Sequence, residues 1–266
     1  MDITHSPFLL ALLGTGFTFA MTALGAAAVF MMGQKRQDLW HSLSMGFAAG
    51  VMTAASCWSL LIPAIELAEE GSVPAFIPAA GGFLLGALFL YVLDQRIPHQ
   101  HPDSLVPEGP KSHWHRATLL FVAVTLHNIP EGMSVGLSFG MAGMTGDAGT
   151  LATSVALALG MGIQNIPEGA AVALPMLQIG KGKWQAFGIG AASGAVELIF
   201  GVLAAVSIAM IAPAMPWLLA FTAGAMIYVV VEELIPAARL TEHTDSGTLS
   251  FIAGFTLMMI LDVALG

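Results

Sequence analysis

The chain has 266 residues, of which 56% are hydrophobic and only 9% charged, and its mean hydropathy is +0.82. Soluble domains use about 45–50% apolar residues, so this composition indicates a membrane protein. Eight basic and 17 acidic residues give a net charge of −9, which argues against a nucleic-acid partner. The single cysteine, Cys57, excludes disulfides and zinc clusters built on cysteine.

Eight stretches of the sequence are long and apolar enough to cross a bilayer as helices, each of which needs about 20 residues. The loops between them are too short for a second domain, so we expect an all-α polytopic membrane protein with one domain over residues 1–266. The first stretch lacks the basic start and the cleavage site of a signal peptide. The predicted spans are approximately Pro7–Met32, Trp40–Ile65, Pro74–Leu93, Ala117–Met141, Thr150–Leu177, Gln185–Ile211, Trp217–Ala238 and Thr248–Leu265.

The basic residues indicate how the chain is threaded through the membrane. Every Lys and Arg lies in alternate loops, and the positive-inside rule places such loops in the cytoplasm. Both termini are then outside. Acidic residues in the opposite loops either concentrate cations near an entrance or are ordinary solvated carboxylates at helix ends. The eight basic residues are Lys35, Arg36, Arg96, Lys111, Arg116, Lys181, Lys183 and Arg239.

One six-residue phrase occurs twice, as HNIPEG at 127–132 in the fourth predicted span and as QNIPEG at 164–169 in the fifth. A charged residue at the centre of a membrane helix costs about 2.5–3.5 kcal/mol on insertion scales. A cost repeated at equivalent positions of two helices points to a shared function. Residues i and i+4 share a helix face, so His127 lies over Glu131 and Gln164 over Glu168.

The two phrases together form the pattern of a cation site. Consecutive spans run antiparallel, so two copies of one motif face each other across a pseudo-two-fold axis, a recurring plan in transporters. One imidazole, two carboxylates and three amide oxygens then meet, a set that suits Zn²⁺, Fe²⁺, Mn²⁺ or Cd²⁺. Pro130 and Pro167 each free a backbone carbonyl near the site, and Gly132 and Gly169 permit close helix approach.

Single residues of the spans, taken alone, also have ordinary structural explanations. A lone buried His or Gln commonly makes a helix–helix hydrogen bond. Glu197, in the middle of the sixth span, is either a ligand or a structural partner. Met52, in the second span, is either a soft ligand or part of the core. Asp262, in the eighth span, receives no role.

Polar clusters also occur at the predicted cytoplasmic side. Four histidines punctuate the loop at about 95–116, and a His-bearing tract can hold metal transiently. Glu232, Glu233 and His243 gather near the end of the seventh span, either as an exit relay or as an interfacial cluster.

The paired motifs, the eight spans and the His-bearing loop closely resemble the ZIP (Zrt/Irt-like) metal transporters, and most of all the prokaryotic members. The resemblance covers essentially the whole chain. It implies a transporter, not an enzyme, that needs no cofactor and moves zinc, and also iron, manganese or cadmium, into the cytoplasm. The implied partners are divalent metal ions, the lipid bilayer and a second copy of the chain in a homodimer. The implied location is the plasma membrane, which is the inner membrane in a Gram-negative bacterium.

The resemblance further implies a binuclear site near mid-membrane, with Glu131 and Glu168 bridging. The ligands of one metal would be Met52, His127, Glu131, Gln164 and Glu168. The ligands of the other would be Asn128, Glu131, Asn165, Glu168 and Glu197. The metal would enter near Glu66 and leave near Asp94, His99, Glu233 and His243. Spans one, four, five and six would move as an elevator against the other four.

Two residues depart from the family pattern. Many members have His where this chain has Gln164, and some close relatives have Asp where it has Asn165. Each change weakens coordination, and the second removes a formal negative charge. The first site is therefore the stronger expectation.

Two other classes of protein compete with this interpretation. An intramembrane metal-dependent hydrolase would use a zinc with an open position to activate water. The sequence, however, contains no H-E-x-x-H, and no Ser/His/Asp set can be assembled. A structural membrane subunit would leave the buried carboxylates unexplained. A P-loop is also absent, so we do not expect ATP to drive the protein directly.

Overall fold

The computed structural model describes residues 6–31, 37–98, 116–238 and 245–265, and within these ranges the protein is helical and has no β-strand. Eight rods follow one another along the chain, one for each predicted span. They are α1 (Pro7–Ala26) with the turn η2 (Ala27–Phe30); α2 (Gln37–Ala55), η4 (Ser56–Leu61) and α3 (Ile62–Glu69); α4 (Phe76–Arg96); α5 (Arg116–Thr145); α6 (Ala148–Gln178); α7 (Lys183–Ile211) with η5 (Ala212–Ala214); α8 (Met215–Val229), η6 (Val230–Leu234) and α9 (Ile235–Ala237); and α10 (Ser246–Leu265).

Six of the rods are long and apolar enough to cross a membrane, judged over the described residues by length and composition. α5 and α6 are the two longest helices, with 30 and 31 residues, but the polar motif interrupts each of them and they are not among the six. On the other rods, large apolar side chains point outward, as on a surface that faces lipid. Leu84 of α4 is 66% exposed, for example, and Val263 of α10 is 71% exposed. These features indicate a multi-pass membrane protein.

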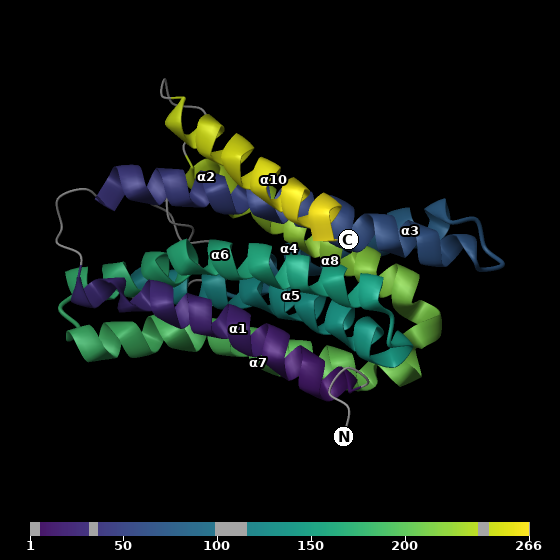
Figure 1. Ribbon diagram of the computed structural model, residues 1–266. Coiled ribbons are helices and arrows are strands. Elements are labelled where there is room, and N and C mark those ends of the chain that lie inside the picture. Colours follow the sequence, from purple (N-terminus) through teal and green to yellow (C-terminus); the bar gives the residue numbers. More distant parts are fainter. Residues whose placement is uncertain (1–5, 32–36, 99–115, 239–244, 266) are drawn as a thin grey trace.

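The rods pack in two groups, which lie one above the other in Figure 1. In the first, which we call the four-helix unit, α1 packs against α5, α6 and α7, and α5 packs along α7. In the second, α2 packs on α10 and α4 on α8. The two groups meet where α6 touches α2 and α10, and where α5 touches α8. The four-helix unit consists of the spans that the family resemblance groups together, while their relative motion stays a prediction.

The two ends of the helical chain lie on the same side of the protein. The start of α1 and the end of α10 both lie in the right-hand half of Figure 1. An even number of crossings requires this arrangement.

The glycines that close the two motifs lie where helices touch most closely. A Cβ added to Gly132 would be 2.4 Å from Cα of Glu197, and one added to Gly169 would be 2.0 Å from the carbonyl oxygen of Thr22. No side chain fits at such distances. The predicted close approach at both glycines is therefore confirmed, and it brings α7 and α1 directly against the motifs.

A tight turn between α5 and α6 sets the two motif helices side by side and antiparallel. Gly146 turns the chain with a φ of 67°, a conformation that glycine adopts without strain. Asp147 then caps α6, because its carboxylate accepts hydrogen bonds from the backbone N–H of Thr150 at 2.7 Å and from the Thr150 hydroxyl at 2.9 Å. These bonds hold the pKa of Asp147 below its usual value.

Two rods contain a wide, π-helical turn directly before a proline. In η4 the N–H of Ile62 bonds back five residues to Cys57, and Pro63 follows. In η6 the N–H of Ile235 bonds back five residues to Val230, and Pro236 follows. Proline has no N–H and its ring displaces the carbonyl four residues earlier, so a wider turn relieves the crowding. These turns were not predicted from the sequence.

Candidate metal centre

The two motifs supply six polar side chains that are buried in the protein. None of these side chains is more than 7% exposed. A seventh buried polar residue, Glu197, comes from α7 and is 1% exposed. The six are His127, Asn128 and Glu131 on α5, and Gln164, Asn165 and Glu168 on α6.

Hydrogen bonds fix the amide groups of both asparagines against α7. Nδ2 of Asn165 donates to Oε2 of Glu197 at 2.7 Å, and the hydroxyl of Thr22 on α1 donates to the other oxygen of Glu197 at 3.1 Å. Nδ2 of Asn128 donates to the main-chain carbonyl of Ser193 at 2.8 Å. The Oδ1 atom of each asparagine has no hydrogen-bond partner among the described residues. Both amide oxygens are therefore free to accept.

Further buried oxygens near the asparagines also lack partners. Neither carboxylate oxygen of Glu131 and neither side-chain polar atom of Gln164 makes a hydrogen bond within the described part of the chain. The two side chains lie beside each other at a geometry short of a hydrogen bond. Buried polar atoms without partners are rare, and each costs about 1–3 kcal/mol. Several of them in one place fit a site that binds a ligand.

The carboxylates would repel one another when they are ionised together. Glu131 interacts electrostatically with Glu168 and Glu197, and Glu168 interacts with Glu197 and Glu233. This repulsion is strong in a medium of low dielectric constant. A cation among the carboxylates would turn the repulsion into attraction and would take up the unpartnered oxygens.

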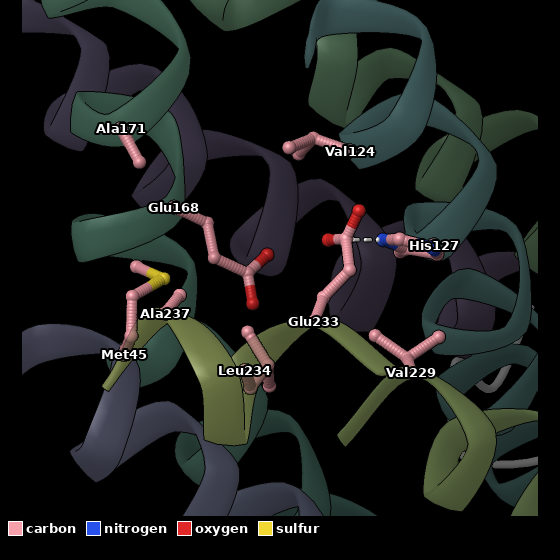
Figure 2. A pocket seen from close by; sticks show the side chains of 9 residues that line it. All are labelled: Met45, Val124, His127, Glu168, Ala171, Val229, Glu233, Leu234 and Ala237. Carbon is pink, nitrogen blue, oxygen red and sulfur yellow. Dashed lines mark ion pairs between the residues drawn. The ribbon is translucent and has the colours of Figure 1, made fainter. Parts of the chain in front are cut away.

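His127 is paired with a residue from outside the four-helix unit. Its Nδ1 lies 2.8 Å from Oε2 of Glu233 in η6, and both side chains are buried. Figure 2 shows the carboxylates of Glu233 and Glu168 directed into the same small pocket. The pocket has a volume of about 20 Å³, enough for one water molecule. It lies between α5 and α6 on one side and α2 and η6 on the other.

The remaining predicted ligand and pathway residues occupy separate places. Met52 is fully buried in α2. Asp94, near the end of α4, accepts a hydrogen bond from the hydroxyl of Tyr228 at 2.8 Å. Glu66 of α3 is exposed and lines a pocket of about 280 Å³ at the end of the protein where α1 begins. His99 and His243 lie outside the described residues.

The side chains do not yet form a closed coordination shell. Among the described residues, no three His, Cys, Asp or Glu side chains come close enough together to hold one metal ion. His127 is directed to Glu233, and Glu197 is held by Thr22 and Asn165. The motifs are therefore in one region, but their donor atoms point to different partners.

Known proteins provide a test that is independent of this geometry. The family model of the ZIP zinc transporters matches residues 98–262, which include both motifs. The chain belongs to this family. It is 37% identical to zinc transporter ZIP11 of Homo sapiens, with 98% of this chain and 99% of the relative covered. It is 34% identical to zinc transporter GufA of Myxococcus xanthus (92% and 94% covered), and 38% identical to zinc transporter ZIPB of Bordetella bronchiseptica (96% and 81% covered).

ZIP membership confirms the resemblance predicted from the paired motifs. It also favours transport over the hydrolase reading, for which the comparisons offer no support. The ZIP relatives include both a human protein and bacterial ones at similar identity, so the likeness extends beyond the prokaryotic members.

Residues of α1 and α7 that support the motifs of this ZIP chain were not predicted from the sequence. Thr18 accepts a 3.3 Å hydrogen bond on its main-chain oxygen from Asn165, and Thr22 holds Glu197. Ser193 holds Asn128. A signal was present in α1, because Thr15, Thr18 and Thr22 recur every three to four residues in an apolar helix and therefore form one polar stripe.

Proposed function

We propose that the protein carries divalent transition-metal cations, zinc first, through the plasma membrane into the cytoplasm. Iron, manganese and cadmium suit the same mixed set of nitrogen and oxygen donors. The relatives named above are zinc transporters. We expect α5 and α6 to cross the membrane with the six apolar rods, and both termini to face outward.

The observation that carries this proposal is the set of buried carboxylates with unpartnered amide oxygens around them. Glu131, Glu168 and Glu197 come from three adjacent helices and repel one another. Such groups are expensive inside a membrane protein and typically mark an ion pathway. Soft thiolates are absent from the set, so a borderline or hard divalent ion suits it better than Cu(I).

We infer two metal positions that share the carboxylates of Glu131 and Glu168. The first would add His127, Gln164 and the thioether of Met52. The second would add Asn128, Asn165 and Glu197. The Oδ1 atoms of both asparagines are free to ligate, and their Nδ2 atoms are held by neighbouring groups. The second position lacks the charge that an aspartate at 165 would bring, so we expect it to be the weaker one.

Metal entry requires the donors to turn toward one another. His127 would leave Glu233, and Glu197 would open its contacts to the ion. Glu233 then stands ready to receive the metal or a proton from His127 on the cytoplasmic side. Together with Asp94, His99 and His243 it belongs to the proposed exit, while Glu66 belongs to the proposed entrance. Movement of the four-helix unit against the other rods would alternate access.

Uptake of Zn²⁺ or Cd²⁺ into sealed liposomes that contain the purified protein tests the proposal. We expect saturable uptake that depends on the protein and is lost in the double variant Glu131→Gln, Glu168→Gln. A reconstituted protein that gives no uptake above empty liposomes for any of the four metals would overturn the transport proposal. Metal-dependent cleavage of a peptide added to the same liposomes would instead support a hydrolase.

A further inference from the structure

A groove opens on the side of the four-helix unit at the end where α6 passes into α7. We call it the lateral groove. It has a volume of about 470 Å³ and lies between the start of α5, the end of α6 and the start of α7. Ile189, Gly188 and Ala192 of α7 form part of its apolar wall. Its size is in the range of typical small-molecule sites.

The lateral groove opens on an exposed apolar face of α7, and no residue of the metal centre lines it. Gln185, Gly188 and Ala192, which line it, share one face of α7, because residues three or four apart lie together on a helix. The same face continues along α7 as Ile199, Leu203 and Val206, whose side chains are 50–54% exposed. An apolar stripe on the outside of a membrane helix contacts acyl chains, so the groove is a hollow in a lipid-facing surface.

The polar groups of the lateral groove gather at one end of it. Lys181 follows α6, Gln185 is in the first turn of α7, and Thr118 is in the first turn of α5. All three side chains are exposed. A cation and two hydrogen-bonding side chains therefore stand at the mouth, beside an apolar trough that runs toward the middle of the membrane.

The neighbouring residues show where the mouth lies relative to the bilayer. Trp184 is 76% exposed and packs against Phe30 with ring centroids 4.8 Å apart. Exposed tryptophans are enriched at the level of the lipid headgroups. The ammonium of Lys183 donates to the main-chain carbonyl of Phe30 at 3.4 Å. Lys183 is thus engaged with η2, whereas Lys181 lines the groove.

We propose that the lateral groove binds one anionic phospholipid of the cytoplasmic leaflet, with an acyl chain in the trough and the phosphate at Lys181, Gln185 and Thr118. Charge complementarity selects this occupant, because basic pockets between membrane helices on the cytoplasmic side suit anionic headgroups. A metal ion is disfavoured by the lysine, and a soluble anion would leave the apolar trough empty. The proposal assumes the cytoplasmic orientation of this loop and is independent of the metal ligands.

Native mass spectrometry of the full chain in detergent tests the site. The protein is equilibrated with phosphatidylglycerol or with phosphatidylcholine of the same acyl chains, and the bound lipid that survives detergent removal is counted. We expect one phosphatidylglycerol to be retained in preference to phosphatidylcholine. Lys181→Gln should weaken phosphatidylglycerol binding about fivefold, as expected for one lysine near an anionic headgroup. Arg96→Gln, which removes an equal charge from another rod, should leave it unchanged.

A second pair of variants tests the trough without touching a charge. Gly188 lines the groove, and a Cβ added there meets nothing within 4 Å, so Gly188→Leu should fill the trough without disturbing the packing. A Cβ on Gly16 of α1 also meets open space, outside the groove, and makes Gly16→Leu a matched control. We expect retained phosphatidylglycerol to fall several-fold in Gly188→Leu alone. Equal retention in both leucine variants, or equal losses in Lys181→Gln and Arg96→Gln, would overturn the proposal.

Discussion

The side-chain amide of Asn165 on α6 donates a hydrogen bond to the carboxylate of Glu197 on α7 at 2.7 Å. This bond joins the second motif to the helix that packs directly on Gly132 of the first. It also gives one oxygen of the buried Glu197 carboxylate a hydrogen-bond donor. An amide at position 165 therefore holds α6 to α7 through a neutral donor.

Replacing Asn165 by Asp should exchange that bond for a repulsion that a cation relieves. The new carboxylate would lie about where Nδ2 now contacts Glu197. We expect Asn165→Asp to melt at a lower temperature than the wild type in a chelator, and to gain more thermal stability from added Zn²⁺. Binding to the folded state alone raises stability by RT ln(1 + [L]/Kd), so the gain reports affinity. An identical zinc-induced shift in both proteins would mean that residue 165 is not a ligand.

Glu131 and Glu168 should be indispensable for transport. Both are buried, both belong to the proposed bridging pair, and neutralising either removes a charge that two metals would share. We expect Glu131→Gln and Glu168→Gln each to abolish saturable zinc uptake in liposomes. Glu69→Gln, in the exposed last turn of α3, is the control and should transport normally. Substantial uptake by either buried variant at equal reconstitution would contradict the bridging role.

Metal affinity should fall in acid. Imidazole and carboxylate groups bind a metal only when they are deprotonated, so protons compete with it. We expect the equilibrium dissociation constant for Zn²⁺ to increase as the pH falls from about 7 to about 5, the range in which histidine titrates. Isothermal titration across this range measures the effect. A flat profile would argue against His127 as a ligand.

The pairing of His127 with Glu233 predicts a competition between binding and release. In Glu233→Gln the histidine loses its ionic partner and is freer to bind metal. We expect equal or tighter zinc binding in equilibrium titrations, together with slower uptake in liposomes because the exit has lost a carboxylate. Glu232→Gln changes the neighbouring exposed carboxylate and serves as the control. Weaker zinc binding in Glu233→Gln would show that Glu233 belongs to the binding site itself.

Close packing at the motif glycines should be intolerant of a single methyl group. Gly132→Ala would place its Cβ 2.4 Å from Cα of Glu197, against backbone that cannot move aside alone. Overpacking of this kind costs about 1–3 kcal/mol. We expect a clear loss of thermal stability in detergent. Gly16→Ala has open space and should be neutral or slightly stabilising, because alanine favours helix more than glycine does. Equal melting temperatures in the two variants would contradict the packing described.

Much of the fold could be predicted because the hydropathy pattern and the lipid environment restrict it to helices. Each predicted span has its own rod, and the helix pairing at Gly132 and Gly169 followed from their position beside the motifs. The interruptions were harder to predict. A proline in an apolar span can kink a helix, begin one or follow a wide turn, and nothing local to Pro63 or Pro236 separates these outcomes.

The residues of the candidate site could be located from the sequence, but their partners could not. The repeated NIPEG phrase identified the buried carboxylates. The free-energy cost of placing a glutamate in an apolar helix occurs at the same position of two helices, which indicates a shared function. The bond from Thr22 to Glu197 depends on how α1 lies against α7, 175 residues away in the chain. The pairing of His127 with Glu233 depends on a wide turn in another rod. Such contacts depend on how the helices pack against one another, and the order of residues along the chain does not show this packing.

Because of the wide turn at Val230–Leu234, the number of residues in this rod decides whether the side chain of Glu233 points to His127. One residue corresponds to about 100° of rotation in an α-helix. Deleting a single residue there would restore regular winding and would turn the side chain of Glu233 away from His127, even though every helix, loop and motif kept its composition. Among relatives, a one-residue gap in this rod would therefore separate chains that present a carboxylate to the histidine from chains that do not.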